Sequence, residues 1–79
     1  MIDNKINNEI SETIFRMNLA NYRKQNNITQ AQVAERSGLS LSCVANIEKG
    51  RNSPMLESVI KYCDAIGLEI YVNLTKKDE

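Results

Sequence analysis

The sequence predicts an all-α domain of about four helices with one short C-terminal β-strand. Three observations support this fold class. The chain has 79 residues, which is enough for one compact domain and too few for two. Apolar residues recur at helical spacing in four stretches that are separated by asparagine, glycine or proline. After Gly67 the apolar residues alternate with polar ones instead, which is typical of a half-buried strand.

The first predicted helix covers residues 9–25 and follows a polar segment at residues 1–8. We expect this segment to be a flexible N-terminal arm, because short polar termini are seldom held by the rest of a domain. One stripe of the helix carries apolar side chains at spacings of three and four residues: Phe15, Leu19 and Tyr22. The asparagines at positions 26 and 27 favour the left-handed conformation that ends a helix.

Two short helices are predicted next, at residues 30–36 and 41–49. Thr29 and Gln32 form a capping-box pattern at the start of the first, since each side chain can satisfy a free backbone N–H of the other residue. Gly38 supplies the turn between the two helices. Two helices joined by so few residues have the spacing of a helix-turn-helix.

The fourth predicted helix covers residues 55–66. We expect Ser53 to cap it and Pro54 to open it, because proline in the first helical position loses no hydrogen bond. Residues 68–74 then alternate in polarity and predict the strand. Residues 75–79 form a polar tail, which we expect to fray. The organisation is therefore an arm, a helical domain over residues 9–67, a strand and a tail.

Composition argues against several classes of function. The chain contains no histidine, which is the commonest general base and zinc ligand, and its two cysteines have neither metal-ligand spacing nor the pattern of a disulfide framework. We interpret Cys43 and Cys63 as small apolar core residues. No nucleophile–base pair or glycine-rich phosphate loop is visible, so we expect no enzyme, no catalytic residue, no metal and no cofactor. The lack of a signal peptide or membrane-length apolar run predicts a soluble, cytoplasmic protein without a membrane partner.

Charge is distributed unevenly along a chain whose formal net charge is zero. Residues 23–53 hold five basic and two acidic side chains, for a net charge of +3. Residues 1–22 carry −1 and residues 54–79 carry −2. Because an electrostatic field depends on local placement, the basic middle segment can attract nucleic-acid phosphates.

The predicted helix-turn-helix has a specific layout within QAQVAERSGLSLSCVANIEK, residues 30–49. Small, glycine and branched apolar residues occupy the positions where two short helices must cross closely: Ala34, Gly38, Leu39, Val44 and Ile47. With Arg23, the Thr29–Gln30 opening, the Ile47–Gly50 stretch and the loop to Pro54, residues 13–67 resemble the lambda-repressor-like Xre/Cro family of DNA-binding domains. The predicted strand replaces the usual fifth helix and is similar to the C-terminal strand of HipB-type antitoxins.

The resemblance implies contacts with double-stranded DNA. In this family the second helix of the motif lies in the major groove. The implied base contacts are Ser40, Leu41, Ser42, Ala45 and Asn46. The implied phosphate contacts are Gln30, Lys49, Arg51, Asn52 and Ser53. For both sets the alternative is that they are ordinary solvated residues. The family pairs an arginine of its first helix with a glutamate that ends its third, which implies a structural ion pair between Arg23 and Glu48.

The predicted strand indicates a homodimer. A lone strand leaves backbone N–H and C=O groups unpaired, so residues 68–74 are expected to pair with their copy across a two-fold axis. The expected interface side chains are Leu68, Ile70, Val72 and Leu74, packed against the fourth helix. The alternative is that this segment packs within its own chain as an irregular tail.

The sequence therefore predicts a sequence-specific DNA-binding transcriptional regulator, a repressor that binds a palindromic operator as a homodimer. Two alternatives remain open. One is an antitoxin that neutralises a protein toxin and represses its own operon. The other is an interaction module that keeps the fold without binding DNA, which the apolar Leu41 and Ala45 would favour.

Overall fold

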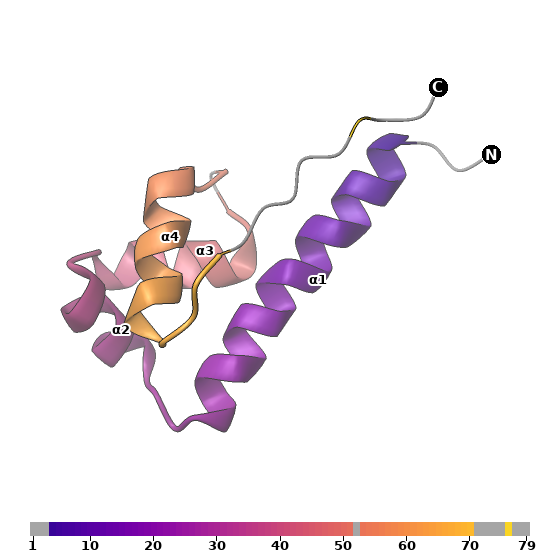
Figure 1. The fold of residues 1–79 in the computed structure, drawn as a ribbon. Coiled ribbons are helices and arrows are strands. Elements are labelled where there is room, and N and C mark those ends of the chain that lie inside the picture. The colour runs from indigo at the N-terminus through magenta and orange to yellow at the C-terminus, as the bar shows by residue number, and fades with distance from the viewer. Residues whose placement is uncertain (1–3, 52, 71–75, 77–79) are drawn as a thin grey trace.

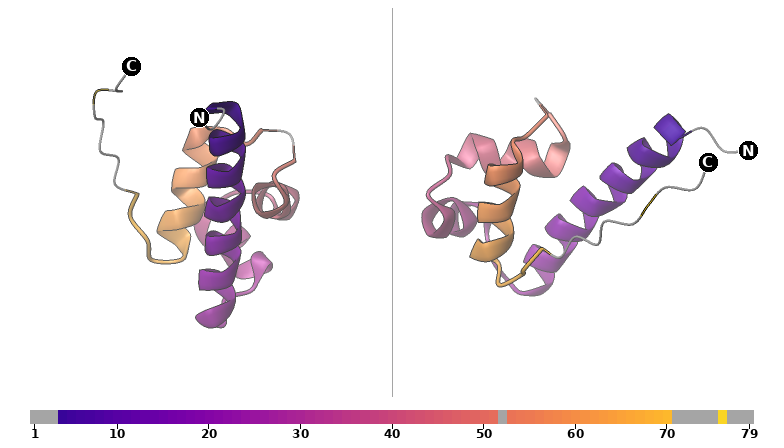
Figure 2. Two further views of the ribbon diagram at one scale, coloured as in Figure 1. Left: turned by 90° about the vertical axis from the view of Figure 1, so that its right-hand side faces the viewer. Right: turned by 45° about the horizontal axis from the view of Figure 1, so that its top comes forward.

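The computed structural model describes residues 4–51, 53–70 and 76, with residues 4–11 described as helical backbone only. Its elements are four helices: α1 (Asn4–Gln25), α2 (Gln30–Ser37), α3 (Leu41–Lys49) and α4 (Leu56–Ala65). The three shorter helices gather along one side of the long α1 (Figure 1). The first turns of α1 extend away from this group, as the right-hand view of Figure 2 also shows. The predicted all-α architecture is confirmed.

Two predicted helix starts are wrong. α1 begins at Asn4, so residues 4–8, which we assigned to a flexible arm, are helical; neither glycine nor proline interrupts them. α4 begins at Leu56 after an N-cap at Met55 that makes no side-chain cap hydrogen bond. Ser53 cannot act as the predicted cap, because its φ of 37° lies outside the extended region that an N-cap adopts.

The ends of α2 and α3 follow the sequence signals closely. The Thr29 hydroxyl accepts a hydrogen bond from the Gln32 backbone N–H at 3.1 Å, and the Thr29 N–H donates to Gln32 Oε1 at 2.8 Å. This is the predicted capping box. Gly38 and Gly50 end the two helices with φ values of 78° and 72°, in the left-handed region that favours glycine.

The core lies where all four helices meet. Its buried apolar residues are Leu19, Val33, Val44, Ile47, Tyr62, Cys63 and Ile66. Cys43 is half-buried and packs against this cluster, so both cysteines have the expected apolar role. Leu56 and Ile60 have helical spacing to the buried Cys63 and yet are 71% and 49% exposed. The face of α4 that carries Tyr62 and Cys63 turns inward and leaves those two side chains outside.

The predicted strand is only partly covered by the structure. Residues 68–70 have no regular secondary structure, although Leu68 and Ile70 pack against the core. Val72 and Leu74 lie outside the described residues. The strand therefore stays a prediction. None of the helices in the described part of the chain is long and apolar enough to cross a membrane.

Candidate nucleic-acid interface

α2 and α3 form a helix-turn-helix with a connection of three residues, Gly38 to Ser40. The Ser40 hydroxyl caps α3 by accepting a hydrogen bond from the Cys43 backbone N–H at 3.1 Å. Val44 and Ile47 are fully buried and turn one face of α3 into the core. The other face is therefore presented to solvent. It carries Leu41 and Ser42, which are exposed, and Ala45 and Asn46, which are half-buried.

An open hollow of about 300 Å³ lies between α3, the loop after it and the start of α4. It is lined by Ser40, Ser42, Cys43, Asn46, Arg51, Ser53, Pro54, Met55 and Ser58. The structure thus brings three predicted base contacts together with two predicted phosphate contacts on one surface. Leu41, Ala45, Gln30 and Lys49 do not line it. No acidic side chain is among the described residues that form it.

The loop after α3 folds back on that helix. The Arg51 backbone N–H donates to the Asn46 carbonyl oxygen at 3.0 Å, and this bond brings the exposed Arg51 beside the last turn of α3. Lys49 is also exposed, whereas Asn52 lies outside the described residues. Met55 and Ser58 were missing from our predicted site. They line the hollow only because the loop folds back on α3. Nothing in the sequence around Met55 and Ser58 predicts that return.

The carboxylate of Glu48 points away from this surface. Its side chain is 8% exposed and is held by the Arg23 guanidinium. Arg23 Nε donates to Oε2 at 2.7 Å, and Arg23 Nη2 donates to Oε1 at 2.9 Å. The remaining Nη1 donates to the Ile28 carbonyl oxygen at 2.9 Å. This two-point geometry is the strongest form of arginine–carboxylate pairing.

Two further side chains bind the same carboxylate. Gln30 Nε2 donates to Oε1 at 3.1 Å, and the Tyr62 hydroxyl donates to Oε2 at 2.5 Å. Side chains of α1, α2 and α4 therefore converge on one residue of α3. We did not anticipate Tyr62. Its helical spacing with Val59 and Ile66 could have placed it in the core, where a tyrosine hydroxyl needs a partner.

These contacts keep Glu48 ionised. Burial alone would raise the pKa of Glu48, but the hydrogen bonds from Arg23, Tyr62 and Gln30 outweigh it and hold the pKa below its ordinary value. The hydrogen bond to Glu48 raises the pKa of Arg23. Burial, reinforced by the Glu48 carboxylate, raises the pKa of Tyr62, so its hydroxyl remains a donor. The one acidic residue of α3 is thus neutralised inside the protein.

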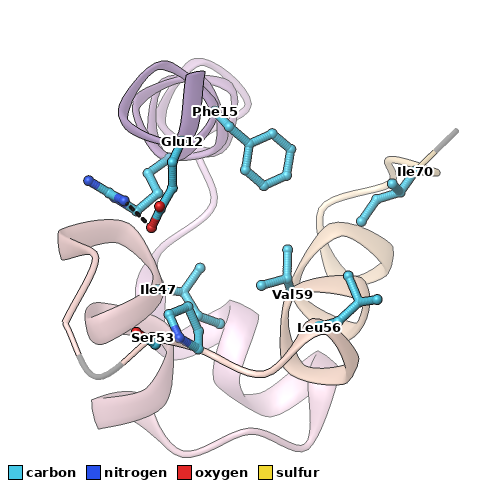
Figure 3. Close-up of a pocket in the computed structure, with 9 residues that line it drawn as sticks. Glu12, Phe15, Ile47, Ser53, Leu56, Val59 and Ile70 are labelled. Carbon is cyan, nitrogen blue, oxygen red and sulfur yellow. Dashed lines mark hydrogen bonds and ion pairs between the residues drawn. The ribbon is translucent and has the colours of Figure 1, made fainter. Parts of the chain in front are cut away.

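A second hollow, of about 400 Å³ and mainly apolar, lies between α1 and α4 (Figure 3). It is lined by Glu12, Phe15, Arg16, Ile47, Ser53, Pro54, Leu56, Val59 and Ile70. Figure 3 shows Phe15 projecting from α1 toward Val59. Ile70, one of the predicted interface residues, stands at the far side of the hollow from the ion pair between Glu12 and Arg16.

The fold and this surface define a helix-turn-helix protein. The sequence matches the helix-turn-helix family over residues 19–72, and the chain belongs to that family. The resemblance to the lambda-repressor-like Xre/Cro type is thereby confirmed. The family is one of DNA-binding transcription regulators and not a class of enzymes. The likeness to the HipB-type strand stays a prediction.

The chain is similar to three curated proteins. It is 42% identical over 52 residues to the cryptic phage CTXphi transcriptional repressor RstR of Vibrio cholerae. The match covers 66% of this chain and 46% of that protein. It is 38% identical over 48 residues to the immunity repressor protein of Bacillus phage phi105, at 61% and 33% coverage. The chain thus spans less than half the length of either repressor.

The third relative is matched over most of its length. It is an uncharacterized HTH-type transcriptional regulator, y4dJ, of Sinorhizobium fredii, which is 31% identical over 62 residues. The match covers 78% of this chain and 80% of that protein. No solved structure matches the chain significantly.

Proposed function

We propose that this chain is a sequence-specific DNA-binding transcriptional regulator that represses by occupying operator DNA. The observation that carries this proposal is the placement of charge around α3. Glu48 is buried against Arg23, while the opposite side of the helix shares a hollow with Arg51. None of the described residues that line this hollow is acidic. Such a surface attracts phosphates without a carboxylate to repel them. Two relatives named as repressors support the same function.

In this proposal α3 lies in the major groove and five residues meet base edges: Ser40, Leu41, Ser42, Ala45 and Asn46. Asn46 can pair with adenine through its amide, Ser42 can donate or accept, and Leu41 can contact a thymine methyl. The Ser40 oxygen already accepts the cap hydrogen bond, which leaves its O–H as a donor. Because few of these side chains form two-point base contacts, DNA shape contributes a larger share of specificity.

Phosphate contacts supply affinity and register rather than sequence information. They are assigned to Gln30 at the start of α2 and to Lys49, Arg51, Asn52 and Ser53 after α3. Arg51 and Ser53 line the same hollow as Asn46, so backbone and base contacts can form at one surface.

Selection from a random duplex library tests the proposal, with the two kinds of contact separated by variants. Asn46→Ala should weaken binding to the selected sequence by roughly 1–3 kcal/mol and relax one base position. Arg51→Ala should weaken binding to selected and random duplexes alike. It should also reduce, by about one, the steepness with which the logarithm of the binding constant falls with the logarithm of the salt concentration. Arg36→Ala is the matched control: Arg36 donates to the Ala65 carbonyl oxygen, away from the hollow.

Two outcomes would contradict these roles. If each variant loses as much affinity for the selected duplex as for random duplexes, the division between base and phosphate contacts is wrong. If the parent binds no duplex at low salt, the interaction module without DNA binding is the better description.

The second part of the proposal is a homodimer in which residues 68–74 pair with their copy. The apolar hollow between α1 and α4 supports it, because Leu56 is 71% and Phe15 42% exposed beside it. A second copy would cover these side chains together with Ile70. The interface set is Leu68, Ile70, Val72 and Leu74, the last two outside the described residues. A two-fold axis would direct two α3 helices to half-sites about one helical turn apart, giving a palindromic operator.

Light scattering tests the homodimer. The double variant Ile70→Asp/Val72→Asp should fall to monomer mass and lose tight operator binding, because two carboxylates would have to be buried in an apolar interface. The circular dichroism spectrum of the double variant should remain that of a helical protein. Asn73→Asp, on the other face of the predicted strand, is the control and should remain dimeric. An unchanged mass of the double variant would place the interface elsewhere, with α1 as the next candidate.

The same apolar hollow favours one second candidate function, an antitoxin whose protein partner is a toxin. A neighbouring gene whose product arrests growth, and whose arrest this chain relieves through a stoichiometric complex, would establish it. Normal growth on expression of every neighbouring gene would leave the repressor without this additional role.

A further inference from the structure

We infer that Glu48 is a positioning residue for DNA binding: through its hydrogen bond to Gln30 it fixes a side-chain amide at the start of α2 for contact with a DNA phosphate. The inference rests on the proposed function, since it requires the N-terminus of α2 to face DNA. We call the four side chains that meet at this carboxylate the Glu48 cluster: Glu48, Arg23, Gln30 and Tyr62. This buried cluster then has a role at the surface in addition to its role in holding the helices together.

The geometry of Gln30 is the first step. Gln30 follows the N-cap Thr29 and is the first residue of α2. Its Nε2 lies 3.1 Å from Glu48 Oε1, and within the described part of the chain Glu48 is the one hydrogen-bond partner of this amide. A primary amide carries two diverging N–H bonds. With one N–H on Glu48, the other is directed away from the carboxylate and can donate to a phosphate oxygen.

The rigidity of the acceptor is the second step. Glu48 is 8% exposed, and each of its carboxylate oxygens also accepts a hydrogen bond from Arg23. The Tyr62 hydroxyl adds a further bond to Oε2. A glutamine on the surface has several rotatable bonds, and ordering it on binding costs entropy. Because Glu48 already holds the Gln30 amide in the free protein, less of that cost remains when DNA binds.

A purely structural role for Glu48 predicts something different. In that case changing Glu48 lowers stability and alters DNA binding equally whether or not Gln30 carries an amide. Positioning predicts coupling instead: the Gln30 amide contributes to affinity only while Glu48 holds it. A double-mutant cycle measures this difference, because effects that are independent cancel in it.

The cycle uses Gln30→Met and Glu48→Met, which both keep the length of the side chain. The first removes the Gln30 amide, and the second removes both carboxylate oxygens, so that no side-chain atom at position 48 can accept a hydrogen bond from Gln30. Binding to a random-sequence duplex at low salt is measured for parent, single and double variants, each shown by thermal melting to be folded at the assay temperature. Gln30→Met should weaken binding about three- to tenfold in the parent and less than twofold beside Glu48→Met. The general gain from losing a negative charge cancels in this ratio.

Arg51→Ala provides the control within the same two backgrounds. Its loss of affinity should be the same with Glu or Met at position 48, because Arg51 binds phosphate independently of the Glu48 cluster. An equal effect of Gln30→Met in both backgrounds would overturn the inference while leaving the proposed function intact. Absence of duplex binding by the parent would instead overturn the proposed function, and the DNA role of Gln30 with it.

Relaxation of the side-chain amide nitrogens in the unmodified chain gives a second test that needs no Glu48 variant. The Gln30 amide should be more restricted on the nanosecond timescale than that of Gln25, which is exposed at the end of α1. Equal mobility of the two amides would show that Glu48 does not hold Gln30 and would overturn the inference.

Discussion

Two arginines of α1 each pair with a glutamate at the same shortest nitrogen–oxygen distance, 2.7 Å, but in very different surroundings. Arg23 reaches across to Glu48 on α3, and both side chains are 8% exposed. Arg16 pairs with Glu12 one turn away on its own helix, and the two side chains are 20% and 61% exposed. The distance alone therefore does not distinguish a pair that ties the fold together from one that does not.

The difference lies in what each pair would leave behind if broken. Removing one member of the buried pair strands a charge away from water, which is costly. Removing one member of the exposed pair leaves a charge that water and salt solvate. Arg16 has a packing role instead: its guanidinium lies so close to Gly50, at the end of α3, that a side chain at that position would displace it.

The largest effect is expected from Arg23→Ala. Loss of the guanidinium leaves Glu48 buried with only Gln30 and Tyr62 as donors, so the free energy of unfolding should fall by about 3–5 kcal/mol. Urea or thermal unfolding measures it. Arg16→Ala, which removes the same residue type from the same helix, is the control and should cost much less. If Arg23→Ala melted like the parent but no longer bound DNA, Arg23 would be a phosphate contact rather than part of the core.

A smaller effect is expected from Tyr62→Phe. The change removes only the hydroxyl, and Glu48 keeps both Arg23 bonds, so a loss of about 1–2 kcal/mol in unfolding free energy is expected. Tyr22→Phe removes the same group from a side chain that is 36% exposed and should stay within about 0.5 kcal/mol of the parent. Equal unfolding free energies of the two variants would mean that the Tyr62 hydroxyl does not stabilise the carboxylate.

The ionisation of Glu48 should make part of the stability depend on pH. Because its pKa in the folded protein lies below the ordinary value of 4.5, the ionised form stabilises the fold above pH 4.5, and this contribution is lost as the pH falls through the lowered pKa. Thermal melting between pH 7 and pH 3 measures this contribution when the parent is compared with Glu48→Gln, which cannot titrate at this position. The difference in melting temperature between parent and variant should become smaller toward acid pH. A constant gap would show that Glu48 does not titrate with a lowered pKa.

The smallest effect is expected from Glu12→Ala. The pair with Arg16 is exposed and lies four residues apart on one helix, so its loss should change the unfolding free energy by less than about 0.5 kcal/mol. Raising the salt concentration should shrink even that difference. A loss comparable to that of Arg23→Ala would show that burial is not what separates the two pairs.

Local signals predicted much of this molecule because they act within a few residues. The capping box at Thr29 and Gln32 and the glycines that end α2 and α3 depend on neighbouring backbone groups alone, and the structure has them where the sequence placed them. The start of α4 shows the limit of such signals. Ser53 and Pro54 form a typical cap, yet the turn after α3 puts Ser53 at a φ incompatible with it.

The sequence by itself determined the start of α2, the ends of α2 and α3, the helix-turn-helix and the family, because these follow from spacing along the chain. Only the tertiary structure decided which side chains meet: that Tyr62 and Gln30 join Arg23 on the Glu48 carboxylate, and that Ser58 lines the same hollow as Asn46. Helical periodicity ranks faces by polarity but does not fix how far a helix is rotated, which is why Leu56 and Ile60 are exposed. That rotation is set by the fit of several helices at once, and it placed a charged cluster at the centre of this fold.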